Sequence, residues 1–250
     1  MITQTQQEMT ALDALLSHVS IRKYTDQPID DAKLQRILDA ARRAPTSSNT
    51  QSYSIVVVRD TETKRTLAEL VGNQKHVETC AVFMAFVADL SRLKRANALH
   101  DAPLAINNEL TMVAIVDASL VGMAAQVAAE ALGLGTVMIG GARNLPEEVA
   151  RLLHLPEGAF VVYGMCLGYP AERPLQKPRL PEAEVVHYER YRQQDDDLLH
   201  EYDAALAAHY RDEGRTTSDA AWTGVMAKQF SQPRRPFMRA VLEKLGMNFD

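Results

Sequence analysis

Apolar and polar residues alternate along the 250-residue chain in patterns that predict both helices and strands. Leu34, Ile37, Leu38 and Ala41 recur at helical spacing after a candidate cap at Asp30. Further helices are expected over residues 8–17, 61–71, 118–132 and 146–153. Runs of branched and aromatic residues predict buried strands over 55–58, 82–87, 136–139 and 161–167. This succession predicts an α+β core over about residues 8–169.

Beyond residue 169 the composition changes. Four prolines (Pro170, Pro174, Pro178 and Pro181) fall within twelve residues, and such a stretch continues neither a helix nor a sheet interior. We interpret residues 170–194 as an extended arm and 195–250 as a helical tail, with helices near 196–209, 219–229 and 236–245. The whole chain, 1–250, is expected to act as one domain.

The predicted helix over 118–132 has an unusual composition, because Ala, Gly and Ser occupy most of its positions. A helix this thin lets a neighbouring backbone approach closely. Its partner is not identified by the composition itself.

Composition excludes several classes of protein. Hydrophobic residues make up 46% and charged residues 24% of the chain, which is ordinary for a globular protein and excludes wholesale disorder, collagen and a coiled coil. The net charge of −5 gives no general attraction for nucleic acid. Cys80 and Cys166 each lie in an apolar run, as in proteins of a reducing compartment. Residues 1–10 lack the pattern of a signal peptide, and the longest apolar stretches are shorter than the roughly 20 residues of a membrane span. We therefore expect a cytoplasmic protein.

Common catalytic motifs are absent from the sequence. Gly133-Leu134-Gly135 begins like a dinucleotide fingerprint, but it follows a predicted helix and position 138 is Met. We find no P-loop, no nucleophile elbow and no histidine spacing typical of a metal site.

Four short segments offer groups suited to an anion. Residues 18–22 carry an imidazole, a hydroxyl and a guanidinium, and residues 46–48 carry three hydroxyls. Residues 139–141 end a strand with two glycines, so that a flat ligand can lie against the backbone. Residues 177–179 place two cations on the proline-rich arm. Taken singly, each segment has an ordinary alternative: a helix cap, a turn, a strand corner and a pair of solvated charges.

The order of several blocks adds a second argument. Residues 20–25 (SIRKYT), 44–51 (APTSSNTQ), 72–77 (GNQKHV), 131–144, 167–170 (LGYP) and 177–181 (KPRLP) together resemble the nitroreductase family. The resemblance keeps its order from about residue 8 to 210, and it is to the oxygen-insensitive NADPH nitroreductases and flavin reductases. It implies an α+β sandwich, a central mixed sheet flanked by helices, and a homodimer with two FMN sites at the subunit interface.

The resemblance also implies which residues bind FMN. One subunit would supply His18, Ser20, Arg22, Gln74, Ile139, Gly140, Gly141, Lys177 and Arg179. The other would supply Thr46, Ser47, Ser48 and Thr50. Arg22, Lys177 and Arg179 would hold FMN and favour its anionic reduced form, and Gln74 would bond the polar edge of the flavin. The small-residue helix would be buried against its counterpart in the dimer.

The implied reaction is a ping-pong transfer of two electrons from NADPH or NADH, through FMN, to a nitroaromatic compound or a quinone. No protein nucleophile or metal is expected, because the cofactor carries the chemistry. Two alternatives stay open: an NAD(P)H-flavin reductase that supplies reduced FMN, and a flavin-binding dimer without turnover. The sequence does not name the physiological acceptor.

Three departures from the subgroup affect the expected site. Val19 stands where an arginine is usual, and Met138 stands where an aromatic residue is usual. The loop over residues 211–218 has lost most of the arginines that would hold the 2′-phosphate of NADPH, and it retains Arg215. We therefore expect NADPH and NADH both to serve, with a reduced preference for NADPH.

Overall fold

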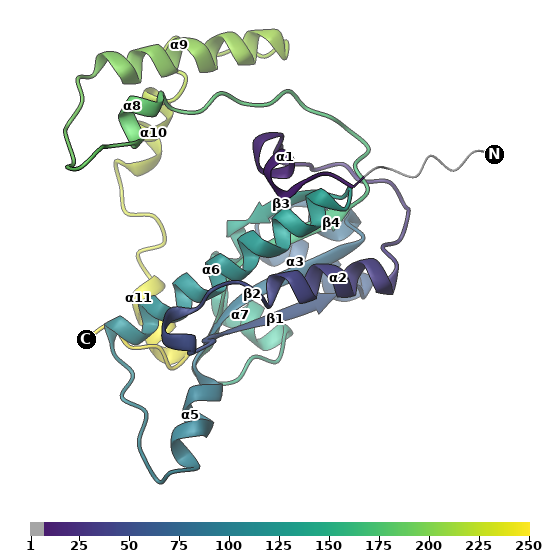
Figure 1. Ribbon diagram of the computed structural model, residues 1–250, viewed down its shortest axis with the longest axis vertical. Coiled ribbons are helices and arrows are strands. Elements are labelled where there is room, and N and C mark those ends of the chain that lie inside the picture. The colour runs from purple at the N-terminus through teal and green to yellow at the C-terminus, as the bar shows by residue number, and fades with distance from the viewer. Residues whose placement is uncertain (1–7) are drawn as a thin grey trace. The chain divides into compact units, whose positions relative to one another are not determined.

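The computed structural model describes residues 8–250, which form two compact units (Figure 1). The first unit extends to Arg173 and includes Phe237–Asp250, and the second comprises Pro174–Pro236. The expectation about a signal peptide falls mostly on residues 1–7, outside the described residues.

A four-stranded sheet forms the centre of the first unit. Its strands are β1 (Tyr53–Val58), β2 (Val82–Asp89), β3 (Gly135–Ile139) and β4 (Ala159–Gly168), in the order β1-β2-β4-β3. All four predicted strands are present, and the α+β class is confirmed. The paired strands are antiparallel throughout, whereas the resemblance implied a mixed sheet. A parallel pairing occurs as a single bridge between Ser20 and Thr136.

Helices cover both faces of this sheet. Met84 and Phe86 of β2 belong to the core cluster beneath α2 (Asp31–Ala41) and α6 (Asn108–Ala131). Phe83 and Ala85 belong to the opposite cluster, beneath α3 (Thr61–Leu70), α4 (Lys75–Thr79) and α7 (Pro146–Leu152). Successive side chains of a strand point to opposite faces, which is why β2 is an uninterrupted apolar run.

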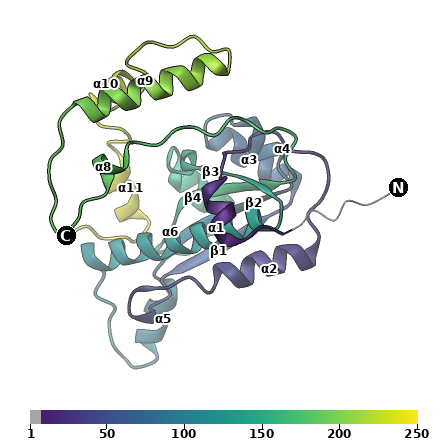
Figure 2. The same cartoon turned by 45° about the horizontal axis from the view of Figure 1, so that its top comes forward.

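Several helix ends follow the expected local chemistry. Asp30 caps α2 by accepting a hydrogen bond from the backbone N–H of Lys33, and Pro146 occupies the first turn of α7. The short helix α1 (Ala11–Leu16) contacts α6 and lies beside it in both ribbon views (Figure 2). The sequence analysis missed α4 and α5 (Ser91–Ala98).

Helix α6 begins ten residues before its predicted start at Ala118, with Asn107 as its cap. Its small residues face the sheet of their own chain. A Cβ atom on Gly122 would lie 1.9 Å from Tyr163 Oη and 3.0 Å from Phe86. Gly122 therefore packs inside the protomer, and burial of this helix against a dimer mate stays a prediction.

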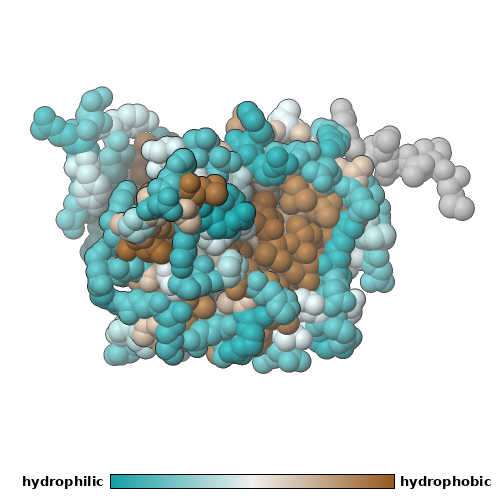
Figure 3. Space-filling view, turned by 90° about the horizontal axis from the view of Figure 1, so that it is seen from below, coloured by the Kyte–Doolittle hydropathy of each residue, from teal (hydrophilic) through white to brown (hydrophobic). Residues whose placement is uncertain are grey.

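The outer face of α6 is apolar instead. Met112, Val116, Leu120 and Met123 follow one another at helical spacing, and each is between 37% and 52% exposed. The neighbouring α1 exposes Leu12, Leu15 and Leu16. A broad apolar area is visible on one face of the molecule (Figure 3). Among the described helices α6 alone is long and apolar enough to cross a membrane, and core helices of soluble proteins meet the same criterion.

The second unit holds α8 (Glu182–Val185), α9 (Asp197–Asp212) and α10 (Thr223–Phe230). Its small core consists of Tyr202, Leu206, Ala207 and Ala221. Asp203 of α9 accepts hydrogen bonds from the backbone of Trp222 and Thr223, which fixes the start of α10. The last helix, α11 (Met238–Lys244), belongs to the first unit, where Leu242 enters the main core.

Candidate cofactor site

Residues 18–22 lie along the open edge of the sheet, next to β3. The N–H of Ile21 donates to the carbonyl of Thr136 at 2.8 Å, and the buried Ile21 side chain packs on Gly135. The N–H of Arg22 donates to the carboxylate of Glu172 at 3.0 Å. The backbone is thus held directly after Ser20, at Ile21 and Arg22, while the Arg22 side chain is exposed. Within the described chain its guanidinium lies 3.5 Å from the Ser20 carbonyl and forms no ion pair.

A buried carboxylate holds His18. Glu130, in the last turn of α6, accepts hydrogen bonds from Thr136 Oγ1 at 2.5 Å and from His18 Nδ1 at 2.8 Å. A side-chain amide of Gln126 also lies 2.9 Å from His18 Nδ1. The Nδ1 atom of His18 thus lies within hydrogen-bond distance of both the Glu130 carboxylate and the Gln126 amide nitrogen. We call Glu130, Thr136, His18 and Gln126 the Glu130 cluster.

The end of β3 offers open backbone at one glycine and a tight contact at the next. Met138 is 41% exposed in a strand that is otherwise buried. A Cβ atom on Gly140 would meet nothing closer than Arg143 at 3.5 Å, whereas one on Gly141 would lie 2.2 Å from the Val71 carbonyl. Packing within the protein therefore explains Gly141, whereas a side chain at Gly140 would meet the Arg143 side chain at an ordinary van der Waals distance. Ile139 is buried and offers its backbone.

Gln74 lies next to Gly141. Its side-chain N–H donates to the Val71 carbonyl at 2.8 Å, which ties the start of α4 to the end of α3. This bond uses one of the two N–H groups of the amide, whose oxygen remains an acceptor.

His76, two residues further on, was not singled out by the sequence analysis. Its Nε2 atom is buried and has no hydrogen-bond partner among the described residues. Burial lowers the pKa of His76, and the positive charge of Arg22 lowers that pKa further. His76 therefore lies close enough to Arg22 for the guanidinium charge to act on the ring; the block 72–77 contained His76, but nothing in its spacing pointed to this neighbour.

Residues 46–52 form a strained loop held by a second buried carboxylate. Ser48, Asn49 and Gln51 have φ angles of 47°, 57° and 50°, in the left-handed region. Asp117 of α6 is fully buried and accepts from the Ser47 N–H at 3.0 Å, the Ser52 N–H at 3.0 Å and Thr50 Oγ1 at 3.1 Å.

Thr50 thus bonds Asp117 within its own chain, although the resemblance assigned it to the flavin. Asp117 and Glu130 were both missed by the sequence analysis. A signal was present, since they and Glu109 are the charged residues of an otherwise uncharged 24-residue helix. Buried charges require partners, so such positions point to polar contacts.

The remaining predicted residues lie in the second unit. Lys177 Nζ lies 5.2 Å from the ring centre of Tyr210 and 3.4 Å from its hydroxyl. Arg215 stacks on the same ring at 4.2 Å and lies 3.5 Å from the carboxylate of Glu213. Burial raises the pKa of Tyr202, and the positive charge of Arg179 opposes this shift. The two residues expected to contact FMN and NADPH, Lys177 and Arg215, therefore share one aromatic platform.

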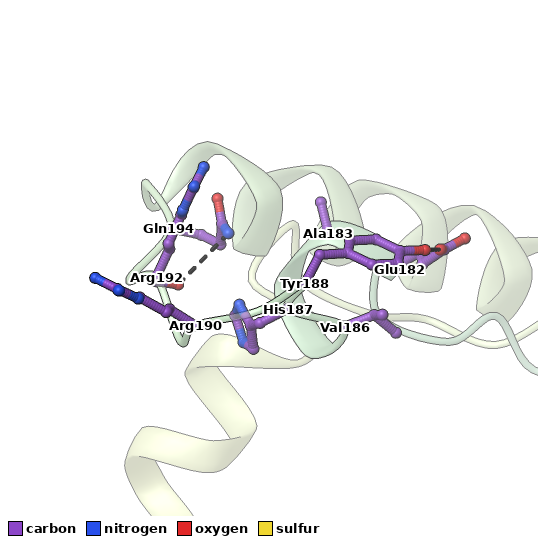
Figure 4. A pocket seen from close by; sticks show the side chains of 8 residues that line it. All are labelled: Glu182, Ala183, Val186, His187, Tyr188, Arg190, Arg192 and Gln194. Carbon is purple, nitrogen blue, oxygen red and sulfur yellow. Dashed lines mark hydrogen bonds between the residues drawn. The ribbon is translucent and has the colours of Figure 1, made fainter.

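One cavity of this unit, of about 410 Å³, is lined by eight residues between Glu182 and Gln194 (Figure 4). None of the predicted site residues lines it. The described residues contain no cluster of His, Cys, Asp and Glu placed to hold a metal ion.

The donor set of the first unit suits FMN. A phosphate requires charge-assisted donors, which His18, Ser20 and Arg22 provide on one fixed segment. A flat ring requires backbone that carries no side chain, which Gly140 provides after the end of β3.

Comparison with known proteins identifies the family of the chain. Residues 15–169 match the nitroreductase family, and residues 177–250 match the C-terminal domain of the nitroreductase family. The chain belongs to the nitroreductase family. An oxygen-insensitive NADPH nitroreductase of Salmonella typhimurium is 40% identical, with 94% of this chain and 97% of the relative covered. An FMN reductase [NAD(P)H] of Bacillus subtilis is 38% identical, with 96% and 98% covered.

Solved structures of the family have the same fold. NfrA2 of B. megaterium superposes with a TM-score of 0.93 at 40% identity, covering 96% of this chain and 98% of its own. An NADPH:FMN oxidoreductase of Vibrio harveyi, solved in complex with NAD+, gives a TM-score of 0.86 at 36% identity, covering 95% and 98%.

Proposed function

We propose that this nitroreductase-family protein is an FMN-dependent oxidoreductase that transfers two electrons from NADPH or NADH to nitroaromatic compounds, quinones or flavins. The observation that carries the proposal is the fixed segment of residues 18–22, which presents His18, Ser20 and the guanidinium of Arg22 beside the start of β3. The relatives that cover nearly the whole chain are an NADPH nitroreductase and FMN reductases. A non-catalytic flavin-binding protein is not supported by these relatives.

The residues of the chain would act on FMN by position and charge. His18, Ser20 and Arg22 would bind the phosphate, and the backbone of Ile139 and Gly140 would lie against the ring. When bound, FMN supplies the hydride chemistry. Lys177 and Arg179 add cations that favour its anionic reduced form, and the oxygen of Gln74 is available to a flavin N–H. Residues 46–52 would complete the site.

We propose further that the active form is a homodimer in which residues 46–48 of one subunit complete the site of the other. The apolar face of α6 (Met112, Val116, Leu120 and Met123) supports a subunit contact. Asp117 and Glu130 are thirteen positions apart on one straight helix, which is about 20 Å at 1.5 Å per residue. The loop held by Asp117 is therefore distant from the segment held by Glu130 in the same chain, as a shared site requires.

Arg215 is the residue we propose for the 2′-phosphate of NADPH. Its stacking on Tyr210 holds the guanidinium in place. The carboxylate of Glu213, which lies 3.5 Å away, competes with a phosphate for this guanidinium. This competition supports a modest preference for NADPH over NADH.

We also propose that the protein is cytoplasmic and acts as one functional domain over residues 1–250. Cys80 and Cys166 are buried free thiols, in keeping with a reducing compartment.

Steady-state kinetics test the proposal. With NADPH and a nitroaromatic or quinone acceptor, we expect parallel double-reciprocal lines, because the donor leaves before the acceptor binds. Arg22→Ala should weaken FMN binding by about 10- to 100-fold, the loss of one charge-assisted contact of about 1.5–3 kcal/mol. Arg42→Ala, an exposed arginine at the end of α2, is the matched control. Intersecting lines, or an Arg22→Ala variant with unchanged FMN affinity, would contradict the proposal.

A further inference from the structure

Asp117 is a buried charge whose contacts are all directed at one loop. Its side chain is fully buried in α6, and within the described residues no ion pair is recorded for it. Its two oxygens accept from the backbone N–H groups of Ser47 and Ser52 and from the Thr50 hydroxyl. A carboxylate without a cation is retained in a core when hydrogen-bond donors compensate for its lost hydration. Here the three donors belong to residues 47–52.

The loop needs such an anchor because its backbone is strained. Ser48, Asn49 and Gln51 are all in the left-handed region, where side-chain-bearing residues are held only if their surroundings determine them. Arg92 of α5 supplies a second anchor by donating to the carbonyls of Gln51 and Tyr53 at 2.9 and 3.2 Å. The loop is therefore shaped within a single chain, before any partner or ligand contacts it.

Asp117 also lies beside the exposed apolar face of α6. Val116 precedes it and is 52% exposed, and Leu120 follows one turn later and is 40% exposed. The same helical turn thus carries the face suited to a second subunit and the anchor of the loop. A contact on that face fixes the position of the loop relative to the partner.

We propose that Asp117 is a positioning residue for the half of the FMN site that each subunit provides to its partner. The proposal rests on the proposed function, since it assumes an FMN site shared by two subunits. Asp117 does not touch the cofactor; it fixes the backbone of residues 47–52, so that Ser47 and Ser48 are presented to the flavin of the partner. Thr50 acts through Asp117 and is a positioning residue as well.

Replacement of Asp117 by Asn tests the proposal. The amide keeps the size of the carboxylate but offers one acceptor oxygen and adds two donors opposite donors of the loop. We expect FMN to bind at least 10-fold more weakly to Asp117→Asn than to the wild type. Glu109→Gln removes an exposed carboxylate from the first turn of the same helix and should leave the affinity unchanged. Thr50→Val removes one of the donors to Asp117 and should reduce the affinity for FMN less than Asp117→Asn does. This variant replaces Asp117→Asn in the test if the latter does not fold.

A mixed dimer distinguishes positioning of the partner's site from a general loss of stability. One subunit carries Arg22→Ala and the other carries Asp117→Asn, with different affinity tags so that the mixed species is isolated. If the loop acts on the partner, both defects fall on one site and the other site is intact. We then expect half of the sites to bind FMN with wild-type affinity, whereas neither parental homodimer has such a site.

The outcomes separate the two levels of the proposal. No wild-type-affinity site in the mixed dimer means that the loop acts within its own chain or that the loss is general, and either overturns the inference. Unchanged FMN affinity in Asp117→Asn also overturns it, while the proposed function stands. A wild-type protein that binds no FMN, or that is a monomer with FMN bound, removes the shared site itself.

Discussion

Replacement of Glu130 by Gln should separate recognition of the phosphate of FMN from recognition of its ring. Glu130 is buried and receives two hydrogen bonds, from Thr136 and His18. Both contacts are made to Oε1, so a glutamine oxygen can accept both, but without the negative charge. Since a hydrogen bond to a charged group contributes about 1.5–3 kcal/mol, we expect the free energy of unfolding to fall by roughly that amount.

The effect on ligands follows from the orientation of His18. Without the negative charge of Glu130, the hydrogen bond to Nδ1 is weaker and the His18 ring is less firmly oriented. Its contact with the phosphate therefore weakens. We expect about 10-fold weaker binding of FMN, equivalent to about 1.4 kcal/mol, and unchanged binding of riboflavin, which lacks the phosphate. Titration calorimetry with both ligands measures this difference, and urea unfolding measures the stability.

Two variants complete the test. Glu109→Gln, on the exposed first turn of α6, should change neither quantity. In a His18→Ala background, Glu130→Gln should have little further effect on FMN binding, because the group it orients is absent. Equal losses for FMN and riboflavin would refute the role assigned to Glu130 and would identify the cluster as a purely structural contact.

Three further predictions concern other parts of the chain. Gly122→Ala should lower the free energy of unfolding by about 1–3 kcal/mol in urea, since its Cβ would collide with Tyr163; an unchanged midpoint would show that α6 is placed differently. Arg215→Ala should lose about 1–2 kcal/mol of the preference for NADPH, measured as the ratio of kcat/KM for NADPH and NADH; an unchanged ratio would mean that another residue binds the 2′-phosphate. Because the pKa of His76 is lowered in the folded protein, the unfolded chain binds more protons than the folded protein just below pH 6.5. The free energy of unfolding therefore decreases as the pH is lowered through this range. His76→Gln should reduce this slope in unfolding experiments at several pH values, and an unchanged slope would assign it to other groups.

Local patterns predicted the strands and the helix ends. β2 and β4 are buried at every position because both of their faces are covered, and this produces apolar runs that the sequence displays directly. Asp30 and Pro146 act on backbone within three residues of themselves, so their roles were also legible. The start of α6 was missed because the helix is apolar on nearly all sides and therefore lacks a polar face that would show its periodicity.

The contacts that arrange the site could not be predicted from local patterns. Asp117 bonds to Ser47, which is 70 residues away, and Glu130 bonds to His18, which is 112 residues away. A single sequence shows that a charge is buried in an apolar helix, but it does not show which loop supplies its donors. The candidate segments were identified by their chemistry and by resemblance, and the groups that hold them required the fold.

The most direct test of the account is an anaerobic titration of the purified protein with NADPH. We predict one FMN per subunit, complete bleaching of the visible flavin absorbance by one equivalent of NADPH, and its return on addition of a quinone or a nitroaromatic compound. A protein that binds no FMN, or whose bound FMN is not bleached by either NADPH or NADH, would contradict the account.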